Sequence, residues 1–184
     1  MPAVLIHNYG LFWTRADVFW GRQNNQGNLK GMRASRRTGK PVDFRLQQGV
    51  YVLYDENFRL VYVGQAGANQ NQRLFSRLKQ HQNDALANRW TRFSWFGIRR
   101  VLKSGQLSTE VIRASVKPTV ILDQIEAILI SSTEPPLNRQ GGRFGKDVKR
   151  YLQYREMDEL GPDTDTMVRE MWKKLPELQK KKAS

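Results

Sequence analysis

Five side chains in this sequence are of types that could carry chemistry together. Tyr51 and Tyr62 lie in short runs rich in β-branched residues, and Arg77 precedes His81 by four residues, which places the latter pair on one face of a helix. Glu126 stands alone among apolar helical positions, where a carboxylate is costly to bury unless it is paired or binds a cation. These groups could move a proton, hold an anion and hold a cation, which are the tasks of phosphodiester hydrolysis.

Local patterns predict the elements that position these residues. Residues 49–54 (GVYVLY) and 59–64 (RLVYVG) are β-rich runs joined by a short turn containing Asp and Asn, which predicts a hairpin. Helical spacing predicts a helix over about residues 72–85, and aromatic and β-branched residues predict a third strand over 92–102. A core helix is expected from residue 119 up to the two prolines at 135 and 136.

In this order, the residues resemble the GIY-YIG nuclease superfamily. Gly49-Val50-Tyr51 is similar to its first motif and Tyr62-Val63-Gly64 to its second. Farther along, Arg77 and His81 are similar to the family's Arg-x-x-x-His helix. Glu126 is similar to its single acidic residue, and Asn138 to the asparagine that closes the core. Each motif alone is weak, but five elements in one order are a much stronger signal, and together they span residues 49–138.

One departure from the family is a long loop between Gly64 and Arg77. Arg73 is therefore a rival for the role of Arg77, although only Arg77 has a histidine four residues later. Taken singly, each of these residues also has an ordinary structural explanation. The tyrosines alternate with valines on predicted strands, and Glu126 could pair with a core arginine.

The resemblance implies an α/β fold, in which a small, mainly antiparallel three-stranded sheet is flanked by helices. It implies that Tyr51 is the general base, that Arg77 holds the scissile phosphate and that Glu126 binds Mg²⁺, with Mn²⁺ as a substitute. A nearby metal and arginine would both favour the phenolate form of Tyr51. Tyr62 would orient the phosphate or a water, His81 would tune Tyr51 or contact the phosphate, and Asn138 would fix the core geometrically.

Charge supports a nucleic-acid partner. The chain has 31 Lys and Arg against 17 Asp and Glu, a net charge of +14, which favours binding to a polyanion. A basic composition alone would also fit a ribosomal protein or a protein that binds anionic membranes. Six basic side chains are candidates for nucleic-acid contacts outside the catalytic pattern: Arg33, Arg36, Arg37, Lys40, Arg73 and Arg143.

The chain is expected to divide into a catalytic core and two additions. Residues 1–48 form an extension with an aromatic cluster and a basic arm at 21–40, and the arm is either a solvated linker or a segment that lies on the phosphate backbone. The core covers 49–145. Two amphipathic stretches within 146–184 predict a C-terminal helical extension.

These features predict a Mg²⁺-dependent DNA endonuclease, and the compact chain with its additions resembles restriction or other defence enzymes. A structure-specific repair nuclease, a non-catalytic binding module and a secreted toxin nuclease remain as rivals, and RNA remains open as a substrate. A homodimer is plausible, because a duplex needs two cuts and the predicted core has one active site. The sequence has no cysteine, no signal peptide and no long apolar run, so a cytoplasmic protein without membrane contact is expected.

Overall fold

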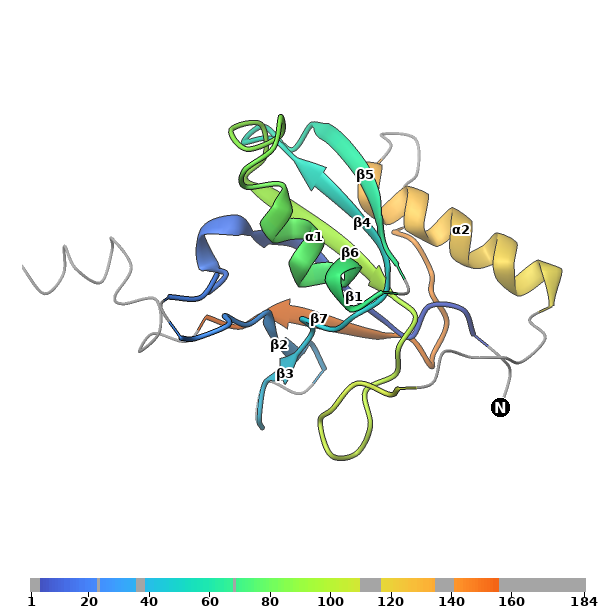
Figure 1. Ribbon diagram of the computed structural model, residues 1–184. Coiled ribbons are helices and arrows are strands. Elements are labelled where there is room, and N and C mark those ends of the chain that lie inside the picture. The colour runs from blue at the N-terminus through green and yellow to red at the C-terminus, as the bar shows by residue number, and fades with distance from the viewer. Residues whose placement is uncertain are drawn as a thin grey trace, which may run out of the picture.

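The computed structural model describes residues 4–22, 24–35, 39–67, 69–109, 117–134 and 141–155 (Figure 1). In chain order, the elements are β1 (Asn8–Thr14), a 3-10 helix (Arg15–Asp17), β2 (Lys30–Arg33), β3 (Val42–Asp43), β4 (Gly49–Tyr54), β5 (Leu60–Ala66), a second 3-10 helix (Gln70–Gln72), α1 (Leu74–Gln80), β6 (Arg92–Gly97), α2 (Pro118–Thr133) and β7 (Lys149–Gln153). Among these residues, no helix is long and apolar enough to cross a membrane.

The expectation of a small three-stranded sheet is wrong, because the strands form one mixed sheet in the order β3-β2-β7-β1-β6-β4-β5. The predicted hairpin and third strand are present as β4, β5 and β6 at one end of this order. They are not alone, since β1 pairs antiparallel with β6 along the edge that a three-stranded sheet would leave open. The chain therefore satisfies the backbone groups of β6 on both sides.

The four further strands come from the segments expected to be additions. β2 lies inside the predicted basic arm, and β7 lies inside the first predicted C-terminal amphipathic stretch. β7 is held between β1, to which it is parallel, and β2, to which it is antiparallel. The prediction of a helix is therefore wrong at Lys149–Gln153, because pairing with distant strands overrides the local helical pattern. The rest of that extension, 156–184, lies outside the described residues.

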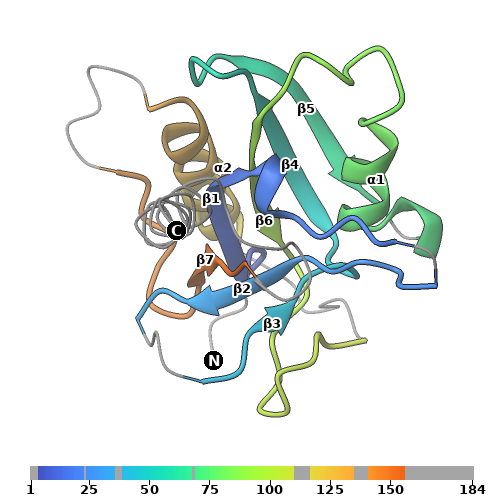
Figure 2. The same ribbon diagram turned by 90° about the vertical axis from the view of Figure 1, so that its left-hand side faces the viewer.

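The two α-helices cover opposite faces of the sheet (Figure 2). On one face, α1 packs Leu74, Phe75 and Leu78 into a large aromatic cluster. On the other face, Ala127 of α2 belongs to a second cluster that includes Val52 and Phe144. Because successive side chains of a strand point to opposite faces, Tyr51 faces α1, and its neighbour Val52 faces α2.

Gly49 begins β4 at a place where only glycine fits. Its φ of +147° belongs to a region that L side chains rarely adopt, and an added Cβ would lie 1.9 Å from the carbonyl oxygen of Phe96. The close approach follows from the pairing of Gly49 with Gly97 across β4 and β6. The first residue of the Gly-Val-Tyr motif thus has a structural role.

We expect Gly49→Ala to lower the free energy of unfolding by more than about 3 kcal/mol, because backbone strain and a clash with backbone act together. Urea unfolding measures the loss. Gly105→Ala is the matched control, since Gly105 also has a positive φ of +83° but would meet nothing within 4 Å. The control should lose only about 1–2 kcal/mol, and an equal loss in the two variants would contradict the clash.

Candidate active site

The two tyrosines meet on the α1 face of the β4–β5 hairpin. Tyr51 pairs with Gly64 across the strands, and Leu53 pairs with Tyr62, so the tyrosines are diagonal neighbours. Their ring centroids are 6.2 Å apart. Gly64 leaves the space between them, because an added Cβ would lie 2.4 Å from Tyr51 Oη and 2.7 Å from Tyr62 Cε1. The glycine of the second motif is therefore required by the packing of both tyrosines.

A chain of hydrogen bonds runs from Tyr51 through His81 to Asp84. Tyr51 Oη lies 2.8 Å from His81 Nε2, and His81 Nδ1 lies 2.6 Å from Asp84 Oδ2. A carboxylate can only accept, so Nδ1 donates to Asp84. In a neutral imidazole this assignment leaves Nε2 to accept the hydrogen bond that the Tyr51 hydroxyl donates. The arrangement has the logic of a hydroxyl–histidine–carboxylate relay, with a phenol in place of the usual alcohol.

Local structure fixes His81 and Asp84 in this chain of hydrogen bonds. His81 directly follows α1, and its carbonyl oxygen accepts a hydrogen bond of 3.2 Å from Trp90 Nε1. Asp84 Oδ1 accepts the backbone N–H of Leu86 at 2.8 Å. Partial burial raises the pKa of Asp84, but the Leu86 N–H, His81 and Arg77 together bring it below its ordinary value. Asp84 is therefore held as a carboxylate that orients His81.

Sequence reasoning missed Asp84. The signal that could have found it is its position three residues after His81, beyond the end of the short helix. The predicted helix over 72–85 hid this signal, because α1 ends at Gln80 and the chain then turns.

Arg77 stands beside both phenols. Burial lowers its pKa, but hydrogen bonding and charge interactions with Tyr51 and Tyr62 outweigh that effect and raise it. Its Nη1 donates to Gln80 Oε1 at 2.8 Å, whereas its Nε is buried and has no hydrogen-bond partner in the described residues. A cation with a free donor is thus placed at the tyrosine pair. Arg73, the rival, instead directs Nη1 to the carbonyl oxygen of Gly67 at 3.3 Å.

The environment of Tyr51 favours the protonated phenol. Burial raises the pKa of Tyr51 to about 12, against the opposing influence of Arg77. The side chain is 0% exposed. The expected preference for phenolate is therefore not met by the described residues, and the Tyr51 phenol keeps its proton at neutral pH.

Glu126 does not join this group. It lies on α2, on the opposite face of the sheet, and its side chain is exposed. The expectation that its carboxylate is buried among apolar side chains is wrong, because α2 exposes three of its larger apolar side chains and buries smaller or polar ones. The exposed set is Leu122, Ile125 and Leu129, and the buried set is Gln124, Ala127, Ser131 and Ser132.

Internal hydrogen bonds explain this orientation of α2. Gln124 Oε1 accepts the backbone N–H groups of Leu5 and Ile6, at 3.0 and 2.7 Å. The carbonyl oxygen of Ser132 accepts the Tyr54 hydroxyl at 2.8 Å. Polar bonds, together with the packing of Ala127 and the partly buried Ile128, therefore attach the helix to the sheet.

The remaining predicted contacts with nucleic acid are dispersed. Arg33 is exposed on β2, and Lys40 is exposed before β3, so both lie toward the far end of the strand order from β4 and β5. Arg143 is exposed next to Phe144, which packs on the α2 face. The structure does not bring these residues to Tyr51. Three predicted residues lie outside the described part of the chain: Arg36, Arg37 and Asn138.

Within the described ranges, no group of three or more His, Cys, Asp and Glu side chains is arranged to hold a metal ion. Comparisons of the chain with protein-family models, with curated proteins and with solved structures give no match. The function of the protein is therefore inferred from the geometry around Tyr51.

The buried tyrosines should make the protein sensitive to alkali. Burial raises the pKa values of Tyr51 and Tyr54 to about 12 from an ordinary value of 10.0. A raised phenol pKa means that the fold favours the neutral form, so the stabilisation is complete below about pH 10 and is lost as the pH rises to about 12. We expect each tyrosine to account for at most about 2–3 kcal/mol of this loss.

Urea unfolding at pH 9 and pH 11.5 measures the effect. Tyr51→Phe and Tyr54→Phe should each reduce the difference between the two pH values, because each removes one group that must ionise. A difference that stays at the wild-type value in both variants would show that other groups cause the alkaline loss.

Proposed function

We propose that this protein is a DNA endonuclease of the GIY-YIG type that hydrolyses phosphodiester bonds. The observation that supports the proposal is the hydrogen-bonded chain of Tyr51, His81 and Asp84 beside the cation of Arg77. The predicted motif residues Tyr51, Tyr62, Arg77 and His81 come together on one face, although they derive from two strands and a helix. The resemblance further suggests a role in restriction or other defence against foreign DNA, and the sequence features described above suggest a cytoplasmic location.

In the proposed chemistry, Tyr51 passes protons rather than holding a charge. As the water oxygen bonds to phosphorus, the bond from phosphorus to the leaving sugar oxygen breaks, and that oxygen takes a proton from solvent. Tyr51 Oη accepts a proton from the attacking water while its own proton moves to His81 Nε2. The resulting imidazolium is stabilised by the Asp84 carboxylate on Nδ1. This route avoids a free phenolate, which a pKa of about 12 disfavours.

Arg77 supplies positive charge for the phosphate. A guanidinium presents a planar fork of donors that fits two phosphate oxygens, and Arg77 has an unpartnered Nε. It is partly exposed, whereas Tyr51 is fully buried. Arg77 would therefore meet the substrate before Tyr51 does.

The metal implied by the resemblance does not fit the described site. Its expected ligand, Glu126, lies across the sheet from Tyr51, and the described residues contain no other cluster of metal ligands. Asp84 already accepts hydrogen bonds from Leu86 and His81. The proposed proton and phosphate steps therefore use side chains of this chain alone, and cleavage measured with and without Mg²⁺ tests the metal requirement.

A second candidate is a DNA-binding module that retains this arrangement without cutting. The complete burial of Tyr51 favours it, because a tyrosine with no exposed surface and a satisfied hydroxyl is a common structural element. Such a module would bind DNA with a steep dependence on salt but would leave the backbone intact.

Cleavage of supercoiled plasmid by Tyr51→Phe tests the proposal. The change keeps the ring and removes the hydroxyl, so the rate should fall by roughly 10²- to 10⁴-fold if Tyr51 relays the proton. The matched control is Tyr54→Phe, which removes a hydroxyl that is equally buried and bonded but faces α2. The control should cut at the wild-type rate.

Three results would be decisive. Nicking or linearisation by the wild type, together with loss in Tyr51→Phe alone, supports the relay. Equal rates in both variants would make Tyr51 structural. No cleavage by the wild type with either Mg²⁺ or Mn²⁺ would favour the binding module.

The placement of Glu126 gives a separate prediction. Because its carboxylate is exposed on the far face, we expect Glu126→Gln to keep the cleavage rate within about 3-fold of the wild type, as is usual for surface changes. Arg77→Gln measured in parallel should lose activity. A loss of 100-fold or more in Glu126→Gln would show that the carboxylate reaches the reaction after all.

A further inference from the structure

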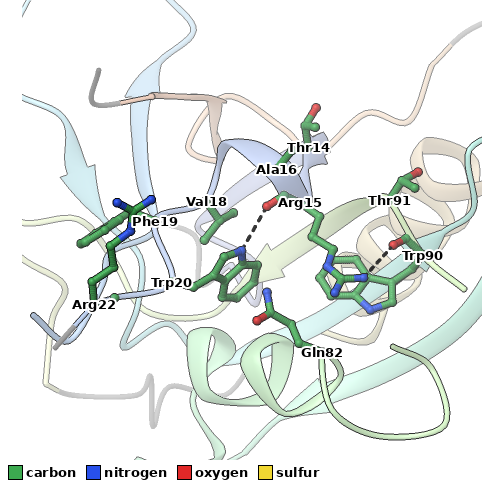
Figure 3. A pocket seen from close by; sticks show the side chains of 11 residues that line it. Thr14, Arg15, Ala16, Val18, Phe19, Trp20, Arg22, Gln82, Trp90 and Thr91 are labelled. Atoms are coloured by element: carbon green, nitrogen blue, oxygen red, sulfur yellow. Dashed lines mark hydrogen bonds between the residues drawn. The ribbon is translucent and has the colours of Figure 1, made fainter. Parts of the chain in front are cut away.

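A pocket beside the candidate active site has no part in the proton relay. Its volume is about 590 Å³, and its wall is built by the turn that follows β1 together with the segments after α1 and before β6 (Figure 3). It adjoins the relay directly. Gln82, which lines it, follows His81 in the chain, and Trp90 on its wall donates to the carbonyl oxygen of His81.

Flat, well-supported groups form the walls. Trp20 stacks on Phe75 with ring centroids 5.5 Å apart and an interplanar angle of 28°, and it meets Trp90 nearly at right angles. Its Nε1 donates to the carbonyl oxygen of Arg15 at 3.2 Å. The guanidinium of Arg15 lies over the Trp90 ring, 4.7 Å from the centroid, and donates to the carbonyl oxygens of Ala87 and Trp90. The indole of Trp20 and the plane of Arg15 are therefore fixed before any ligand arrives.

Two polar groups of this pocket are not used by the fold. The amide of Gln82 points into the space between Trp20 and Trp90 in Figure 3, and it has no side-chain hydrogen-bond partner among the described residues. The guanidinium of Arg22 is exposed and likewise has no such partner. None of the described lining residues is acidic.

We propose that this pocket receives an unpaired nucleobase of the DNA substrate, next to the strand that is cut. The proposal rests on the proposed function and adds a specificity site to it. A base presents two flat faces, which stack on aromatic rings and on guanidinium planes, and polar edges, which an amide can read through paired donor and acceptor atoms. Trp20 and Arg15 supply the flat surfaces, Gln82 supplies the amide, and Arg22 can hold the adjoining phosphate.

The charge of the molecule favours this ligand over a neutral aromatic compound. The chain has a net charge of +14, and the described pocket residues contribute two arginines without a carboxylate. A nucleotide satisfies both the aromatic wall and the cations, whereas an apolar aromatic ligand would leave the Gln82 amide unpaired. Since bases in a duplex are stacked, the pocket selects DNA in which a nucleotide is extrahelical or single-stranded.

Binding measured in EDTA tests the proposal independently of cleavage. Two labelled duplexes are compared, one with a single extra adenosine and one with an abasic residue at the same position. The wild type should bind the adenosine duplex roughly 5- to 100-fold more tightly, as expected for stacking of one base. Trp20→Leu and Gln82→Ala should each remove most of this preference while leaving affinity for the abasic duplex unchanged.

Gln106→Ala is the matched control, because Gln106 is an exposed glutamine that does not line the pocket. It should retain the full preference. Trp20→Leu could disturb folding, so Gln82→Ala, which removes only an unbonded amide, decides the case. Equal affinity of the wild type for the two duplexes, or an unchanged preference in Gln82→Ala, would overturn the proposal.

The two proposals fail separately. Plasmid cleavage without a preference for the extra adenosine would leave the endonuclease and remove the base pocket. A preference that depends on Gln82 in a protein that cuts nothing would leave the pocket and remove the endonuclease.

Discussion

The register between β4 and β5 determines where every group of the candidate site lies. Tyr51 lies opposite Gly64, and Tyr62 lies opposite Leu53, so both phenols lie on the face that α1 covers. On that face they lie beside Arg77 and His81. A slip of one residue would send the side chains of one strand to the α2 face and would bring a side chain into the space that Gly64 leaves. The close approach of Gly49 to Phe96 fixes the neighbouring pair of strands in the same way. The motif glycines thus act through geometry, and the chemistry follows from it.

Burial then sets what those groups can do. A phenol with no exposed surface keeps its proton, and its pKa of about 12 shows that one partly exposed guanidinium does not compensate for lost solvation. The hydrogen bond to His81 provides an acceptor for the Tyr51 proton, because Asp84 already orients the imidazole. In this environment, the proposed transfer of a proton through Tyr51 to His81 costs less free energy than formation of a Tyr51 phenolate. The same interactions would stabilise a purely structural tyrosine, and the cleavage rate of a variant without the hydroxyl distinguishes the two roles.

Sequence predicted what local patterning specifies. The β4–β5 hairpin and the Arg77–His81 face follow from alternation, turn residues and helical spacing, and the structure contains both. It did not predict the orientation of α2, because the apolar positions around Glu126 look like a buried face, and the bonds of Gln124 to Leu5 and Ile6 that expose them join residues far apart in the chain. The prediction of a helix at Lys149–Gln153 was wrong for a similar reason, since the partners of this strand are far away in the sequence.

The long-range pairings also change what the N-terminal residues are for. β1 is inserted between β7 and β6, so the segment that follows it is anchored to the sheet and not free in solution. The 3-10 turn after β1 places Arg15 over Trp90, and the chain continues to Trp20, which stacks on Phe75 of α1. The segment that follows this interior strand therefore also forms the wall of the pocket beside the candidate site. Ring stacking and hydrogen bonds thus fix this wall to the core, which is the preorganisation that the proposed base pocket would need to hold a substrate beside the reacting groups.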